Sequence, residues 1–240
     1  MGRVSAPSLE KPRARRRRPS VLGVIGLVLL LGGLGCLGWI AYQYVGTNVV
    51  SKRAFEQESG ELRARWDAQP PAPAVPTGSA DPALSDAQPR AVPGDAIALL
   101  RIPRFGDSYE VPILEGTELS VLARGVGHYP STAQPGQIGN FAIAGHRVTH
   151  GQPFSRLLEL DKGDQILVET RSAIYTYVID TAPRDLTVEE NATWVVDPVP
   201  GQPDATPTQA LITLTTCQDL FHSPDRSIGF GHLQSTKNKG

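Results

Sequence analysis

The residue best suited to chemistry in this sequence is Cys217. The chain of 240 residues contains two cysteines, and the other, Cys36, lies inside a long apolar run near the N-terminus. Cys217 therefore has no partner for an intramolecular disulfide, whereas thiols of exported proteins are usually paired or absent. It ends an alternating, β-branched run, 211–217, so a strand would hold it rigidly. Cys217 is either a nucleophile or a structural cysteine that packs as a small apolar side chain.

A thiol reacts at neutral pH as the thiolate, so it needs a base or a nearby positive charge. Arg226 follows nine positions after Cys217, and its guanidinium keeps its proton and can stabilise an oxyanion. His146 is the leading base because it follows a buried-looking strand and a glycine. The other histidines are His128 and His222, which come next as candidate bases, and His150 and His232, in polar or C-terminal segments.

Other functions compete with a cysteine acyl transferase. His146 and His150 are four positions apart, a spacing that binds zinc on a helix. However, Val148 and Thr149 disfavour a helix, and no glutamate lies between the histidines. A tethered β-domain that binds a wall polymer or a partner would use none of these residues catalytically, and a purely hydrolytic cysteine protease would share the site. We expect no metal and no cofactor.

The N-terminal segment predicts the compartment. Residues 21–40 carry no charge, and a helix of that length spans the roughly 30 Å hydrocarbon core of a bilayer. An arginine cluster at 15–18 precedes the run, and Trp39, Tyr42 and Tyr44 stand at its far end. The positive-inside rule keeps the N-terminus cytoplasmic and places the following domain outside the cell membrane. A cleaved signal peptide is the alternative, but the run is long for one and no A-x-A site follows closely.

The composition along the chain predicts four parts, and the net charge argues against a nucleic-acid-binding protein. The predicted parts are a cytoplasmic basic tail (1–20), a transmembrane anchor (21–45), a juxtamembrane segment with a Pro-rich spacer (46–94) and a catalytic domain (95–235). Residues 47–68 could form an amphipathic helix, and seven prolines prevent a regular helix from 69 to 93. A net charge of −1 lacks the basic footprint of a nucleic-acid-binding domain.

The folded domain is predicted to be all-β. Short β-rich runs lie at 97–102, 109–113, 138–144, 165–169, 173–179, 194–196, 209–214 and 227–230, with short helices expected at 117–122 and 154–160. About eight short strands form a barrel or a sandwich, and the spacing of strands and turns favours a barrel.

The motifs together resemble the sortase family. The segment Thr213-Leu214-Thr215-Thr216-Cys217, the later Arg226 and the Gly145-His146 pair resemble the TLxTC strand, arginine and histidine of sortases. The resemblance covers roughly residues 96–233 and implies a closed eight-stranded β-barrel with one or two short helices. The block 144–157 most resembles class E, the housekeeping type of Actinobacteria, which are Gram-positive.

The resemblance also implies roles for single residues. Cys217 would attack the substrate, His146 would protonate the leaving amine, and Arg226 would stabilise the tetrahedral oxyanion. The residues expected to contact substrate are His150, Thr215 and Thr216.

The implied partners are secreted proteins with a C-terminal LxxTG-type sorting signal, cleaved between Thr and Gly, and a peptidoglycan-precursor amine that resolves the thioacyl enzyme. His150 stands where class E members often have tyrosine, which leaves the choice between LAXTG and LPXTG open. Gly229 and Gly231 stand where bulkier residues are usual, which predicts weaker pairing of the last strand.

Overall fold

The computed structural model describes residues 20–69, 92–217 and 224–239, and for Cys217 it describes the backbone. Most of the predicted tail and spacer, and the candidate base His222, lie outside the described residues. The chain divides into two compact units, Met1–Ala41 and Tyr42–Gly240.

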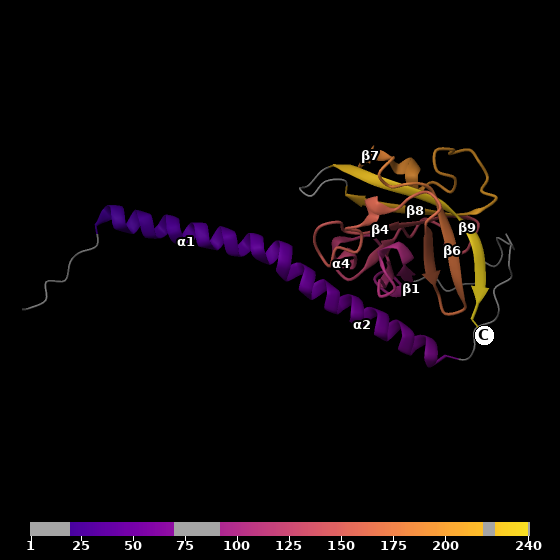
Figure 1. Cartoon of the computed structure of the whole chain (residues 1–240), viewed down its shortest axis with the longest axis horizontal. Helices are drawn as coiled ribbons and strands as arrows, with labels where there is room; N and C mark the ends of the chain where they lie inside the picture. The colour runs from indigo at the N-terminus through magenta and orange to yellow at the C-terminus, as the bar shows by residue number, and fades with distance from the viewer. Residues whose placement is uncertain (1–19, 70–91, 218–223, 240) are drawn as a thin grey trace, which may run out of the picture. The chain divides into compact units, whose positions relative to one another are not determined.

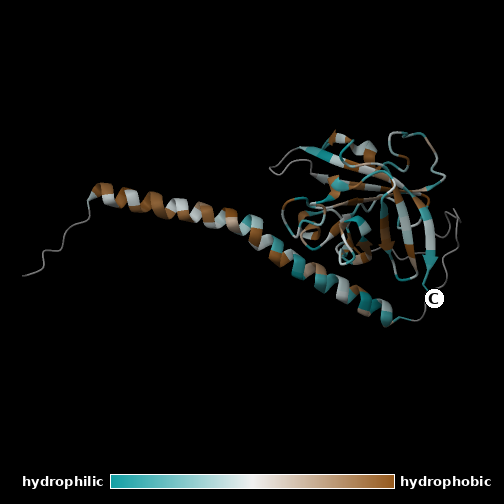
Figure 2. Cartoon of the chain, in the orientation of Figure 1, coloured by the Kyte–Doolittle hydropathy of each residue, from teal (hydrophilic) through white to brown (hydrophobic). Residues whose placement is uncertain are grey.

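The described part of the first unit is an apolar helix, α1 (Val21–Ala41). None of its 21 residues is charged or buried, and residues of hydrophobic character predominate along its length (Figure 2). A helix of this length spans about 30 Å, which matches the hydrocarbon core of a bilayer. α1 is therefore long and apolar enough to cross a membrane, as the sequence predicts.

The second unit contains a closed barrel of eight strands (Figure 1). The strands are β1 (Ala96–Arg101), β2 (Val111–Glu115), β3 (Val126–His128), β4 (Gly139–Ala144), β5 (Gln165–Glu169), β6 (Ala173–Thr181), β8 (Ala210–Cys217) and β9 (Asp225–Asn238). They pair in the order β6-β5-β1-β2-β3-β4-β8-β9, and β9 pairs again with β6, which closes the ring. A further strand, β7 (Thr187–Glu189), pairs with the start of β9. The predicted all-β barrel is confirmed.

Alternating side chains fill the interior of the barrel. Along β6, Tyr175, Tyr177 and Ile179 are buried, and the residues between them are partly exposed. They join Phe141 of β4 and Ile212 of β8 in one apolar cluster. This is the period-2 pattern of strands with one face on a core.

One predicted strand is wrong. Residues 194–196 form a 3-10 helix, η4 (Thr193–Val196). The carbonyl of Val195 accepts a hydrogen bond from Asn140 Nδ2 at 3.1 Å, and Thr213 Oγ1 lies at the same distance from it, so side chains take the place of a partner strand. The ring contains β3 instead, which pairs with β2 and β4 and has only three residues to carry a pattern.

The glycines of β9 lie where the chain is tightly packed. Gly229 and Gly231 both pair with β8, and Gly231 also pairs with β6. A Cβ at Gly231 would lie 2.4 Å from Val178 O, and one at Gly229 would lie 2.8 Å from Pro183 Cγ. The register with β8 is continuous here, whereas the register with β6 shifts between Ile179, which pairs with Gly231, and Thr181. The glycines mark close approach of the backbone, and weaker pairing of this strand stays a prediction.

Short helices occur near the expected positions. The segment 117–122 contains α4 (Leu119–Leu122), and 154–160 contains only a 3-10 turn, η3 (Leu157–Glu159). Another 3-10 turn, η2 (Pro103–Phe105), follows β1.

A long helix precedes the barrel and packs on it. After a short π-helix, η1 (Tyr42–Gly46), comes α2 (Thr47–Asp67), whose buried residues are Thr47, Ser51, Phe55, Ser59 and Leu62. Phe55 belongs to the main core cluster, and Leu62 packs with Leu99 and Leu114. The segment expected to be juxtamembrane thus belongs to the same compact unit as the barrel. The four-part division of the chain stays a prediction.

Candidate active site

Two parallel strands bring the predicted base and nucleophile to one edge of the barrel. β4 and β8 pair in parallel, and Gly145 extends the pairing beyond the end of β4. Its N–H donates to Thr215 O at 3.1 Å, and its carbonyl accepts a hydrogen bond from Thr216 Oγ1 at 2.8 Å. His146 and Cys217 are the next residues of the two segments. Both therefore lie at the carboxyl ends of the same parallel pair.

The third predicted residue comes from the neighbouring antiparallel strand. Arg226 of β9 is paired with Cys217 of β8. Its guanidinium donates to the carbonyls of Pro224 and Asp225, each at 3.2 Å, and contacts Glu190 Oε2 at 3.5 Å. The side chain is 31% exposed, and an ion pair at this degree of exposure contributes little energy. Cys217 and Arg226 are thus neighbours across two paired strands.

His146 is a largely buried imidazole with an unused nitrogen. Within the described part of the chain, its Nε2 is buried and has no hydrogen-bond partner. Its ring stacks on that of His150, with the centroids 4.7 Å apart and the planes at 27°. Burial, and secondarily the charge of His150, lowers the pKa of His146 to about 4. At neutral pH the ring is uncharged and can accept a proton.

A glycine lets the chain turn at the end of β4. A Cβ at Gly145 would lie 2.7 Å from the ring of Phe154, which is fully buried in the core. The N–H of Phe154 donates to His146 O at 3.0 Å. The loop that follows His146 is thus tied back to the core eight residues later.

The predicted substrate-contacting threonines are buried and bonded to the protein. Thr215 Oγ1 lies 3.4 Å from both Ile143 O and the hydroxyl of Tyr129, and Thr216 bonds to Gly145 as described above. His150 Nδ1 shares a hydrogen bond with Thr149 Oγ1 at 2.9 Å. Contact of His150, Thr215 and Thr216 with substrate stays a prediction.

A buried polar clamp beside the site was missed from the sequence. Asn140 Nδ2 donates to Val195 O and Asp197 O, at 3.1 and 3.0 Å, and Thr213 Oγ1 donates to Asn140 Oδ1 at 2.7 Å. These bonds fix the long connection between β7 and β8 over β4 and β8. Thr213 precedes Cys217 by four positions on β8. Polar residues inside two apolar strand patterns were the available signal.

The remaining described histidines lie elsewhere. His128 is fully buried at the end of β3, with Nδ1 2.9 Å from Glu115 Oε2 and Nε2 3.1 Å from Ala133 O. Both ring nitrogens are therefore occupied in the core. His232 is exposed and pairs with Asp180 at 2.8 Å. Of the described histidines, His146 and His150 adjoin the site.

The zinc pair considered from the sequence does not take the required form. His146 and His150 lie in an irregular loop, and their rings stack face to face. Among the described residues, no group of three or more His, Cys, Asp or Glu side chains is arranged to hold a metal ion.

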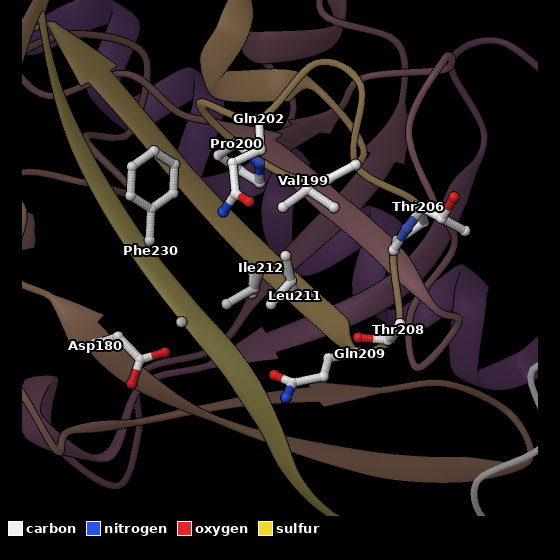
Figure 3. A pocket seen from close by; sticks show the side chains of 13 residues that line it. Asp180, Val199, Pro200, Gln202, Thr206, Thr208, Gln209, Leu211, Ile212 and Phe230 are labelled. Atoms are coloured by element: carbon white, nitrogen blue, oxygen red, sulfur yellow. The ribbon is translucent and has the colours of Figure 1, made fainter.

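A groove of about 430 Å³ lies at the other end of β8 (Figure 3). Leu211 and Ile212 of β8, Phe230 of β9 and the segment 199–209 line it. Leu211 precedes Cys217 by six positions, about 20 Å along a strand. This groove is separate from the edge that carries His146 and Cys217.

Known proteins match this chain across the barrel. The sequence model of the family described as "Sortase domain" matches residues 100–234. Sortase SrtE1 of Streptomyces coelicolor is 35% identical over 241 residues, covering 95% of this chain. The alignment covers 63% of that protein, so the chain spans less than two thirds of this relative's length.

Two solved structures match closely as well. Sortase E from Streptomyces avermitilis is 40% identical with a TM-score of 0.55, over 61% of this chain and 93% of its own. Sortase E1 from Streptomyces coelicolor, crystallised with a tripeptide in the active site, is 35% identical with a TM-score of 0.53, over 62% of this chain and 93% of its own.

Proposed function

This chain belongs to the sortase family, and on that premise we propose that it is a membrane-anchored cysteine transpeptidase. It cleaves an LxxTG-type sorting signal between Thr and Gly and transfers the protein to an amine of a cell-wall precursor. The observation that supports this most directly is the shared edge of β4, β8 and β9, where His146, Cys217 and Arg226 follow or occupy paired positions.

The first half-reaction forms a thioester. His146 accepts the proton of the Cys217 thiol, and the thiolate attacks the carbonyl carbon of the Thr residue. The Arg226 guanidinium donates hydrogen bonds to the oxyanion of the tetrahedral intermediate. The C–N bond to Gly then breaks, and His146 returns its proton to the leaving amine. The acyl group stays on the Cys217 sulfur.

The second half-reaction reverses the roles with a different amine. The acceptor amine attacks the thioester carbonyl and loses its proton to His146, and Arg226 again stabilises the oxyanion. The C–S bond breaks, a new amide bond joins the protein to the acceptor, and His146 returns its proton to the departing Cys217 thiolate. His146 must accept a proton in one step and release it in the next, and an imidazole that is uncharged in the resting enzyme can do both. Arg226 stays charged throughout, which suits an oxyanion partner.

The substrate class draws support from a relative. Sortase E1 of Streptomyces coelicolor holds a tripeptide in its active site, and a peptide backbone supplies the carbonyl that this chemistry needs. The same site would serve a hydrolytic protease, in which water replaces the amine. A transfer assay separates the two.

The proposed location is the cell membrane, with a cytoplasmic N-terminus and an extracytoplasmic barrel. α1 has the length and apolarity of a membrane span, and the basic residues before it favour that orientation. Alkaline phosphatase fused after the barrel should be active in cells, because that enzyme folds only outside the cytoplasm. A fusion that is expressed but inactive would indicate the opposite orientation.

The catalytic proposal is tested with the full chain in detergent micelles. LPXTG and LAXTG peptides are incubated with a panel of amines, and products are identified by mass. Wild type and Cys36→Ala should join the Thr residue to an amine, and Cys217→Ala should not. Absence of Thr–Gly cleavage in every peptide sinks the proposal. If the peptides are cleaved but neither the rate nor the product depends on the added amine, the enzyme is a hydrolytic protease.

A further inference from the structure

The loop after His146 has an unusual backbone. His150, Gly151 and Gln152 have successive φ angles of 54°, 81° and 54°. Two of these three residues are not glycine, and such residues adopt left-handed angles only where their surroundings hold them there. Contacts with neighbouring residues must therefore stabilise the left-handed backbone of residues 150–152.

The helix α2 supplies those contacts. The N–H of Gly151 donates to Asn48 Oδ1 at 2.8 Å, and the N–H of His150 approaches Thr47 Oγ1 at 3.5 Å. The ring of Phe55 occupies the space beside Gly151, where a Cβ would lie 2.6 Å from it. The first turns of α2 thus engage the strained residues of the loop.

The two polar side chains are themselves fixed within their helix. Thr47 Oγ1 donates to Gln43 O, and Asn48 Nδ2 donates to Tyr44 O, both at 2.5 Å. These bonds one turn back set the direction of each side chain. Asn48 therefore presents its Oδ1 to Gly151 without needing to reorganise.

α2 is held on the barrel independently of the loop. Arg63 donates to both carboxylate oxygens of Glu110, at 2.6 and 2.7 Å, and Arg124 pairs with Glu58. At the far end, the ammonium of Lys239 lies 4.6 Å from the ring of Trp66. These contacts make α2 a fixed support on which the loop rests.

The loop in turn determines where His146 lies. The ring of His150 stacks on the ring of His146, so a shift of His150 moves or uncovers the imidazole. The other end of the loop is tied down by Tyr109, whose hydroxyl donates to Pro153 O at 2.7 Å. Between these points, Gln152 bonds within the loop, to Thr149 O at 3.1 Å and to Val148 O at 2.5 Å. The contacts with α2 attach this turn to a neighbouring element.

We infer that α2 is a positioning element for the active site, with Asn48 as the residue that holds the His150–Gln152 turn and, through His150, the imidazole of His146. The catalytic consequence rests on the proposed function of His146. Loss of the Asn48 contact leaves the barrel folded but allows the His146 imidazole to occupy several positions. Imprecise placement of a catalytic group lowers the chemical step about 10- to 100-fold.

The test compares three variants of the full chain in micelles. Asn48→Ala removes the acceptor for Gly151. Asn48→Asp keeps an acceptor for Gly151 but loses the donor to Tyr44 O, so it should recover only part of the activity. Gln57→Ala is the matched control, because Gln57 is an amide on the exposed face of the same helix and donates a hydrogen bond to Glu61 at 2.8 Å.

The expected result for Asn48→Ala is a loss of kcat of about tenfold or more, with the KM for the sorting peptide nearly unchanged and a melting temperature close to that of the control. The NMR signals of the His146 ring should also move, because they lose the ring current of His150. Equal kcat and unmoved His146 signals in Asn48→Ala overturn the inference. Equal losses in Asn48→Ala and Gln57→Ala also overturn it, since they indicate a general effect on the helix.

The NMR readout separates this inference from the proposed function. If wild type transfers no peptide, the proposed function fails. A shift of the His146 signals in Asn48→Ala alone would still establish the positioning contact. If wild type is active and the signals stay fixed, the positioning contact fails and the proposed function stands.

Discussion

Replacing His146 with glutamine should make the barrel relatively more stable in acid while removing transfer activity. The wild-type imidazole is largely buried, and its Nε2 lacks a hydrogen-bond partner among the described residues. Its protonated form is therefore poorly solvated in the folded state. Glutamine has no proton to gain, so the variant avoids the cost of charging this position.

The sign and size follow from the two pKa values. The pKa of His146 is about 4 in the folded protein and near its ordinary 6.5 in the unfolded chain. As the pH falls through this window, the unfolded chain binds the proton first, so wild type loses stability between pH 6.5 and about 4. Each pH unit across the window is worth about 1.4 kcal/mol, for a total of about 3.5 kcal/mol.

The measurement is urea unfolding of the full chain in micelles, followed by the fluorescence of Trp66 and Trp194. The difference in unfolding free energy between wild type and His146→Gln is compared with its own value at pH 8, where both side chains are neutral. At pH 5 the variant should have gained about 2 kcal/mol on wild type. A difference that does not change between pH 8 and pH 4 would refute the reasoning, because it would mean that burial leaves the His146 pKa unaltered.

Three further changes test the surroundings of the site. His150→Ala should raise the pKa of His146 from about 4 toward 6.5, because it removes the stacked ring that shields His146 from solvent and the charge of His150. The acid limb of the pH–rate profile should then move to higher pH. An acid limb that stays in place would contradict this. Gly145→Ala should cost about 1–3 kcal/mol of stability and lower kcat, since its Cβ meets the Phe154 ring; unchanged urea midpoints and rates would show that the ring yields freely. Thr216→Val should cost about 1 kcal/mol, because it removes the 2.8 Å bond to Gly145 O; unfolding curves identical to those of wild type would show that this bond adds nothing.

The barrel could be predicted because most of its strands carry a strong local pattern. β6 alternates buried and partly exposed residues over most of its nine positions, and such a pattern needs no knowledge of neighbours. β3 has three residues, including Gly127, and becomes a strand because β2 and β4 lie on either side of it. The run 194–196 has strand-forming residues, but Asn140 and Thr213 bind its backbone instead. Tertiary contacts decide both cases.

The packing of α2 was hidden by the polarity of its buried face. Positions 47, 51, 55 and 59 recur every four residues, as a buried stripe should, but three of them are Thr or Ser. A pattern search that counts apolar residues finds only Phe55 and Leu62 on this face. The small polar residues are buried because the loop and the barrel approach the helix closely, which the sequence does not reveal.

The candidate site shows the same division. Cys217 could be singled out from the cysteine count, and Arg226 from its spacing to Cys217. The placement of His146 beside Cys217 depends on the parallel register in which Gly145 bonds to Thr215 and Thr216. Register between strands about 70 residues apart follows from the folded barrel, because local patterns do not specify which strands pair.

The pairing of β9 with β6 and β8 sets the order in which this protein can mature. β9 follows every other strand in the sequence, so the ring stays open until this last strand has been made and, on the proposed topology, moved across the membrane. β4 and β8 can pair earlier and bring the histidine near the cysteine, but Arg226 arrives only with β9. Contacts between segments this far apart form slowly. With the proposed roles of Cys217 and Arg226, a chain still in transit carries the thiol without its oxyanion partner, and the proposed reaction becomes available only when the barrel closes.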